Sequence, residues 1–245
     1  MSALIHAGLS DRGRVRKQNE DTWAADPELG LFLVSDGMGG EAEGALASRI
    51  VAKTLPTLVR QRMGSLTDLT AAHAAEKLGQ LLAELSDQVY KEAHGRPGLR
   101  GMGATVVLAL IRGSAALIGH MGDSRAYLLR QGKLQPITHD HSLVQLLLDT
   151  GDITPEEAKV HPTRGQITRY VGMAGEALPE VRLAAVEPGD RLLLCSDGLT
   201  GMLTDEKLAP ILSAGLTPEG TCQRLVAAAN EAGGKDNITA VVVDI

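Results

Sequence analysis

The sequence predicts an α+β layered sandwich, in which antiparallel β-sheets are covered by helices on their outer faces. Apolar runs with strand character occur near the start, in the middle and at the end of the chain, and segments with helical periodicity separate them. Three strand patterns between residues 104 and 133 follow one another across short turns, which is typical of antiparallel hairpins. A regular alternation of strand and helix is absent, so a doubly wound parallel sheet is not favoured.

In the first half, the expected elements are strands at 5–9 and 31–36, a helix from 41 to about 62, a second helix from about 68, and a loop at 94–103. Leu46, Ile50 and Val51 begin an apolar face with helical spacing. Pro56 is expected to kink or shorten this helix, because proline removes a backbone hydrogen bond.

In the second half, the expected elements are strands at 104–112, 115–123 and 125–133, a helix at 144–148, an irregular segment at 151–175, a strand at 191–197, helices at about 205–213 and 218–232, and a last strand at 237–245. Within the irregular segment, Thr154 can cap a short helix whose first residue is Pro155.

Composition limits the classes of function. The chain has 245 residues, of which 44% are hydrophobic, so it can bury a sizeable core. A net charge of −6 and only 2% aromatic residues argue against a nucleic-acid partner. The two cysteines form no zinc-binding spacing and favour a reducing, cytoplasmic location. No apolar run approaches the length of about 20 residues that a membrane span needs.

Five acidic clusters lie at the predicted ends or starts of strands. They are VRKQNED (15–21), VSDGMGG (34–40), MGDSR (121–125), CSDGL (195–199) and GKDNIT (234–239). A fold that gathers strand ends would bring these carboxylates together, and oxygen ligands are what Mg²⁺ prefers. The set indicates a site for more than one metal ion.

Each cluster alone also has a simpler interpretation. Asp36 could bridge two cations while the Gly37 carbonyl coordinates one, but an isolated Asp-Gly more often marks a tight turn. The same holds for Asp197, while Asp236 could cap a turn and Asp123 could be a hairpin residue.

Arg16 and Glu20 share one face of an extended segment, so the guanidinium could bind a phosphate beside a metal-bound carboxylate. A surface ion pair is the alternative. His161 could donate a proton. His139 and His141 could form a metal pair, although two imidazoles without a third ligand favour a structural role.

The ordered motifs RKQNED, DGMGG, GMGAT, GDSR, ITHDHS, SDGL and GKDNIT together resemble the PP2C-type metal-dependent protein serine/threonine phosphatases, in particular the bacterial branch. The similarity runs from about Leu4 to Ile245. It implies a single domain, residues 1–245, folded as a four-layer α-β-β-α sandwich. It also implies that residues 151–175 form a flap beside the active site.

The resemblance also implies roles for individual residues. Asp36 corresponds to the carboxylate that bridges two tightly bound Mn²⁺ or Mg²⁺ ions. The other ligands would be Asp197 and Asp236 for the first ion, Glu20 and the Gly37 carbonyl for the second, and Asp123 with Asp197 for a third, weaker ion. Asp21 would accept from metal-bound water and Arg16 would bind the phosphate. Met38 replaces a histidine of the animal members, so a metal-bound water or His161 is left as proton donor.

The implied activity is hydrolysis of phosphoserine and phosphothreonine in proteins by a metal-activated water. The expected partners are phosphorylated proteins and a cognate Ser/Thr kinase whose signalling the enzyme reverses, and a monomer is expected. Two alternatives stay open: another two-metal phosphoester hydrolase, and a non-catalytic phosphoprotein-binding module. Loss of metal ligands would favour the module, but Glu20, Asp36, Asp197 and Asp236 are all present.

Overall fold

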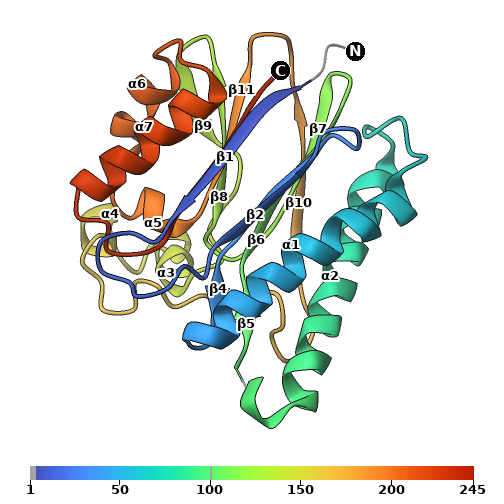
Figure 1. Ribbon diagram of the computed structural model, residues 1–245, viewed down its shortest axis with the longest axis vertical. Helices are drawn as coiled ribbons and strands as arrows, with labels where there is room; N and C mark the ends of the chain where they lie inside the picture. Colours follow the sequence, from blue (N-terminus) through green and yellow to red (C-terminus); the bar gives the residue numbers. More distant parts are fainter. Residues whose placement is uncertain (1–3, 100) are drawn as a thin grey trace.

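Two five-stranded antiparallel sheets pack face to face in the computed structural model, which describes residues 4–99 and 101–245 (Figure 1). The first sheet has the order β1 (Ile5–Asp11), β12 (Ile238–Asp244), β11 (Arg191–Cys195), β8 (Arg125–Arg130) and β9 (Lys133–Pro136). The second has the order β10 (Glu180–Ala185), β7 (Ala115–Met121), β6 (Val106–Arg112), β3 (Leu31–Ser35) and β2 (Thr22–Asp26). A short pair, β4 (Gly37–Met38) and β5 (Gly103–Ala104), lies beside the second sheet.

Helices cover the outer face of each sheet (Figure 1). The second sheet is covered by α1 (Glu41–Met63) and α2 (Ala72–Gly95), and the first by α6 (Asp205–Leu212) and α7 (Pro218–Glu231). Three short helices, α3 (Leu143–Thr150), α4 (Pro155–Ala158) and α5 (Asp197–Thr200), gather at one end of the sandwich, and a 3-10 turn at Pro97–Leu99 follows α2.

Alternate residues of the central strands face different layers. In β3, Leu31 and Leu33 pack with the helices, whereas Phe32 and Val34 pack between the sheets. The strand is therefore apolar at every position, because both of its faces are buried. The predicted four-layer α-β-β-α sandwich is confirmed.

Pro56 was expected to kink or shorten the first helix, and it does not shorten it. Helix α1 runs 23 residues through Pro56. Val51, Leu55 and Val59 on its inner face are fully buried. Each buried side chain of this size contributes about 1.5–3 kcal/mol, which together outweighs the roughly 3 kcal/mol cost of an internal proline.

The boundary of the second helix also differs from the expectation. Helix α2 begins at Ala72 rather than near Asp68. Asp68 instead accepts hydrogen bonds from the backbone N–H and the hydroxyl of Thr70, which closes a turn before the helix.

The strands that the sequence did not reveal, β2, β9 and β10, all lie at sheet edges. None of their residues is fully buried. Edge strands pack on one side only, so they lack the apolar runs that identified the central strands.

Within the described residues, no helix has the length and apolar character that crossing a bilayer requires. Cys195 and Cys222 are buried free thiols.

Candidate metal centre

The predicted ligands come from loops of both sheets. Asp36 follows β3 of one sheet, Asp197 follows β11 of the other, and Asp236 precedes β12, the neighbour of β11. Charge interactions link Asp36 with Asp197, Asp236, Asp21 and Asp123. The fold therefore brings the other four clusters to the Asp36 side chain, so that all five lie together.

The glycines of the two Asp-Gly motifs are required by close backbone packing. A Cβ at Gly37 would lie 2.0 Å from the carbonyl oxygen of Gly44 in α1. A Cβ at Gly198 would lie 1.9 Å from the carbonyl oxygen of Asn237, beside Asp236. Such contacts leave no room for a side chain. These motifs therefore do more than form turns. Gly37 allows the end of β3 to pack against the start of α1, and Gly198 allows the end of β11 to pack against the segment that carries Asp236.

Asp36 is fixed by hydrogen bonds to the strand beside it. Its N–H donates to Thr105 Oγ1 at 3.0 Å, and its carbonyl accepts from the Thr105 N–H at 2.8 Å. Thr105 Oγ1 also lies 2.7 Å from Ser124 Oγ, the residue after Asp123. One threonine thus ties the loop of Asp36 to the loop of Asp123.

Asp21 is buried beside the first sheet. Its Oδ2 accepts hydrogen bonds from Ser196 Oγ and Thr239 Oγ1, each at 2.7 Å. Ser196 directly precedes Asp197. A carboxylate in this position can orient the Asp197 loop, as expected of an outer-shell group.

Glu20 and Gly37 are neighbours in space. The Gly37 N–H donates to the Glu20 carbonyl at 3.2 Å. Glu20 Oε2 lies so close to Gly44 that a Cβ on Gly44 would be 2.3 Å from it. The two groups predicted to bind the second ion therefore lie on the same side of the Asp36 turn.

Arg16 lies at the edge of the carboxylate cluster. Its Nη2 donates to Asp236 Oδ2 at 2.7 Å, while Asp236 Oδ1 accepts from the Asn237 N–H at 2.8 Å. The bond to Asp236 raises the Arg16 pKa, and the charges of Glu20 and Asp36 raise it further. The guanidinium is half exposed, so an incoming anion can reach it.

Burial raises the pKa of four of the clustered carboxyl groups. It raises the pKa of Asp21 to about 7 and that of Asp123 to about 8, with the charge of Asp197 adding to both. Burial followed by the charges of its neighbours raises the Asp36 pKa well above its ordinary value. For Asp197, burial and then the charge of Asp236 raise the pKa. Several acids that resist ionisation together make a site that favours added positive charge.

The donor set suits divalent cations such as Mg²⁺ and Mn²⁺. Asp21 Oδ1, Asp123 Oδ1 and Asp197 Oδ1 are buried without a hydrogen-bond partner among the described residues. Unpaired buried carboxylate oxygens are costly, and hard cations bind such oxygens. The residues present therefore fit the divalent metal ions that the sequence predicts.

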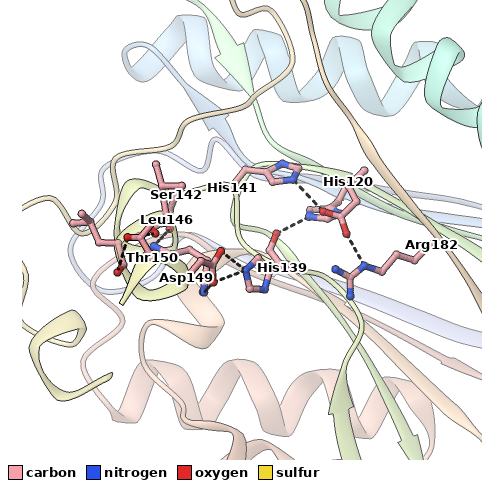
Figure 2. A network of polar contacts seen from close by, with 11 residues as sticks. His120, His139, His141, Ser142, Leu146, Asp149, Thr150 and Arg182 are labelled. Atoms are coloured by element: carbon pink, nitrogen blue, oxygen red, sulfur yellow. Dashed lines mark hydrogen bonds and ion pairs between the residues drawn. The ribbon is translucent and has the colours of Figure 1, made fainter. Parts of the chain in front are cut away.

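The histidine motif has other partners. His139 Nε2 contacts the Asp149 carboxylate at 2.8 Å, whereas His141 stacks on His120 with ring centroids 4.4 Å apart (Figure 2). The two rings are directed to different groups and form no metal pair, which agrees with the structural role that the sequence favoured. The ring of His120, for which the sequence offered no partner, stacks on His141 and has its Nε2 2.8 Å from the His139 carbonyl oxygen.

His120, His141 and Glu180 form a second group with metal-ligand chemistry, with ligand atoms within 4.8 Å of one another. The two rings are tilted by only 16°, so their in-plane lone pairs do not converge on one ion. His141 Nδ1 also accepts from the Gly122 N–H at 3.3 Å, which leaves the proton on Nε2. This geometry favours a structural role beside the Asp123 loop.

Two bridges tie the later part of the segment predicted as a flap. Ile167 pairs with Ser142, and Val171 pairs with Ala104 next to the Asp36 turn. Before these bridges, most residues from 151 to 166 are exposed. His161 lies in this segment with its Nδ1 2.8 Å from Thr163 Oγ1, and its role as a proton donor stays a prediction.

Two supporting groups escaped the sequence analysis. Asn237 is buried, accepts from the Glu20 N–H and donates to the carbonyls of Arg12 and Gln18, so it holds the Arg16 loop against Asp236. The Arg125 guanidinium forms two bonds of 2.7 Å with Asp140. Asn237 stood inside the GKDNIT motif, whereas nothing in the sequence pairs residues 125 and 140.

Known proteins resemble this chain over nearly its whole length. A family model described as protein phosphatase 2C matches residues 12–231. The serine/threonine protein phosphatase PstP of Mycobacterium tuberculosis is 40% identical over 242 residues, which cover 99% of this chain and 45% of the relative. The chain therefore spans about half the length of that relative. The serine/threonine phosphatase stp of Listeria monocytogenes is 34% identical over 244 residues, which cover 98% of this chain and 96% of the relative.

A solved structure supports the same comparison. The catalytic domain of serine/threonine protein phosphatase PstP in complex with two manganese ions superposes with a TM-score of 0.85 at 38% identity. The match covers 98% of this chain and 97% of the other.

The raised carboxyl pKa values predict how the stability of the metal-free protein depends on pH. A carboxyl group whose pKa is raised by folding binds more protons in the folded state, so stability falls as pH rises from about 4 to the raised value. For Asp21 and Asp123, whose ordinary pKa is 3.8, the raised values are about 7 and 8. Lowering the pH from about 8 to 6.5 should therefore raise the melting temperature of chelator-treated protein by roughly 5 °C.

Calorimetric melting curves across this pH range measure the effect. Below about pH 6.5 the trend should weaken, because burial lowers the pKa of His120 and that of His141, to about 4. Saturating Mn²⁺ should abolish the rise in melting temperature on acidification, and Asp36→Asn should make that rise smaller. A flat profile for the metal-free protein would contradict the electrostatic account.

Proposed function

This chain belongs to the protein phosphatase 2C family, and from that membership we propose that it hydrolyses phosphoserine and phosphothreonine in proteins. The observation that carries the proposal is the cluster of buried carboxylates around Asp36, with unpaired oxygens and raised pKa values, next to an accessible arginine. Such a cluster suits two divalent cations, and a pair of divalent cations is one means by which proteins hydrolyse phosphate esters.

Within the site, Asp36 is the proposed bridging ligand, with Asp197 and Asp236 on one side and Glu20 and the Gly37 carbonyl on the other. When bound, Mn²⁺ or Mg²⁺ supplies positive charge for the phosphoryl oxygens and a water of lowered pKa. Asp21, held by Ser196 and Thr239, orients the groups around Asp197.

Arg16 binds the phosphate in this proposal. The guanidinium is paired with Asp236, itself a proposed ligand. Coordination by Asp236 competes with that ion pair and leaves the guanidinium free for a phosphoryl oxygen. Arginine suits this role because its planar donors match two phosphate oxygens at once.

Further parts of the proposal rest on the family resemblance and on local chemistry. Asp123 and Asp197 hold a third, weaker ion, which the unpaired Oδ1 atoms of both residues support. A cognate Ser/Thr kinase supplies the substrates, and the enzyme acts as a monomer. Two buried free thiols support a reducing compartment such as the cytoplasm.

The proposal is tested by phosphate release from a phosphothreonine peptide with and without Mn²⁺, in parallel with cleavage of DNA. Manganese-dependent release without DNA cleavage is expected. DNA cleavage would favour another two-metal hydrolase, and binding of the peptide without turnover would favour a non-catalytic module.

Replacing Asp36 by Asn should lower kcat on the phosphothreonine peptide by more than about 100-fold, since even outer-shell partners of metal ligands cost about 10- to 100-fold. Folding should be retained, because the variant removes a buried charge and keeps the side-chain shape. Steady-state kinetics at saturating Mn²⁺ check this, with Asp87→Asn on the exposed face of α2 as control. Near-normal turnover in the Asp36 variant would refute the metal assignment.

Replacing Arg16 by Ala should raise KM by about 10- to 100-fold, the loss expected for a hydrogen bond to a charged group. The kcat value should change less if the contact is equal in ground and transition states. Arg14→Ala, in the same exposed loop, is the matched control. Unchanged kinetics in the Arg16 variant would remove this residue from the site.

Replacing Asp123 by Ala should leave two metal ions bound and yet cut activity by about 10- to 100-fold. The reason is that only the weaker third ion loses a ligand. Titration calorimetry with Mn²⁺, combined with kinetics, separates the two effects. Loss of the two tight binding events would show that Asp123 belongs to the main pair of sites.

A further inference from the structure

A cavity of about 590 Å³ extends from the carboxylate cluster to the flap. Asp123, Asp197 and Asp236 line its inner end. Helix α3, helix α4 and the flap residue Arg164 line its outer part. The cavity is much larger than a single phosphate group requires, so part of it is available to the rest of a substrate.

The charged residues of this cavity form three groups: an ion pair, three acids and three basic residues. In the ion pair, Arg125 and Asp140 neutralise each other through two hydrogen bonds. The remaining acids, Asp123, Asp197 and Asp236, are proposed metal ligands. Bound divalent cations would therefore offset the negative end of the cavity, but they would leave its basic residues uncompensated.

Three basic residues then remain in the lining of the cavity: Lys159 and Arg164 of the flap, and Lys235 next to Asp236. All three are exposed, and none has a carboxylate within 4 Å among the described residues. The guanidinium of Arg164 donates to the Lys159 carbonyl at 3.2 Å, which holds the two flap residues near each other. Unpaired cations from two separate segments thus face one cavity.

The floor between the acidic and basic ends is apolar. Val144 and Leu148 of α3, Ala158 of α4 and Met202 after α5 line it. None of the residues of α3 is fully buried, so its apolar side chains keep surface that a ligand can cover. An extended peptide could lay its side-chain methylenes on this floor.

From this arrangement we propose that Lys159, Arg164 and Lys235 form a subsite for a second phosphoryl group on the same substrate chain. The proposal rests on the proposed phosphatase function, because it assumes that the reacting phosphate lies at the carboxylate end. A cavity of this volume is about 10 Å across, which corresponds to about three residues of extended chain. The preferred substrates are therefore peptides with two phosphorylated residues about three positions apart.

The choice of a phosphoryl group follows from charge and geometry. Three cations match a dianion better than a single carboxylate, and arginine binds phosphate oxygens through two parallel bonds. Because the three residues are exposed, the gain should depend on ionic strength. A second phosphate far along the peptide cannot reach the subsite.

The test measures kcat/KM for Mn²⁺-loaded protein on a set of peptides of one sequence. These carry a single phosphothreonine, a second phosphothreonine three residues away on either side, glutamate in that second position, or a second phosphothreonine ten residues away. The neighbouring second phosphate should raise kcat/KM about tenfold, and the distant one should not. Release is followed by mass spectrometry at the reacting position.

Variants assign the effect to the subsite. In Lys159→Glu/Arg164→Glu the gain should disappear, while turnover of a small aryl phosphate and of the singly phosphorylated peptide is retained. The matched control, Arg49→Glu/Lys91→Glu, makes the same change of charge on α1 and α2 and should keep the gain. Lys235 is left unchanged because it adjoins Asp236.

The outcomes separate this inference from the proposed function. If neither the aryl phosphate nor the singly phosphorylated peptide is hydrolysed, the phosphatase proposal fails. If both are hydrolysed but the neighbouring phosphate gives no gain, only the subsite is refuted. An equal gain with glutamate, or an equal loss in the control variant, would also overturn the assignment to a second phosphoryl group.

Discussion

The mutual repulsion of the buried carboxylates around Asp36 has to be overcome before any other feature of the site can form. Burial and neighbouring charges raise the pKa values of Asp21, Asp36 and Asp123 together. Two sheets with both faces buried provide the apolar packing that holds these groups close in spite of the cost. The same repulsion is what makes the site favourable for added cations.

The turns at the strand ends determine where the side chains of the site lie. Gly37 and Gly198 let one backbone approach another so closely that a side chain at either position would clash. Thr105 then bonds the backbone of Asp36, and Asn237 bonds the backbone of Glu20. The backbone and its polar neighbours thus hold the loops that carry the carboxyl groups, and one oxygen each of Asp21, Asp123 and Asp197 keeps no hydrogen-bond partner among the described residues.

Much of this arrangement was predictable from the sequence, because the features concerned are strongly patterned. Central strands such as β3 and β12 are apolar at nearly every position, and the acidic motifs adjoin them. The edge strands escaped detection because their residues are only partly buried. The pairing of His120 with His141 also escaped, since it depends on β7 meeting a loop 21 residues further along the chain (141 − 120), and no local pattern encodes that.

Metal loading and substrate recognition are connected through the charge of one cavity. Without cations, the clustered carboxyl groups disfavour a phosphate, and Arg16 is engaged by Asp236. Two divalent ions held by these residues would add four positive charges, which would offset most of the negative charge at the inner end and compete with Arg16 for Asp236. The basic residues of the outer end, Lys159 and Arg164, keep their charge throughout. In this proposal a phosphorylated chain can first be attracted by the flap, but it binds with its phosphate at the inner end only when the metal ions are present. In this proposal, affinity for the reacting phosphate therefore depends on metal occupancy more steeply than affinity for the second phosphoryl group does.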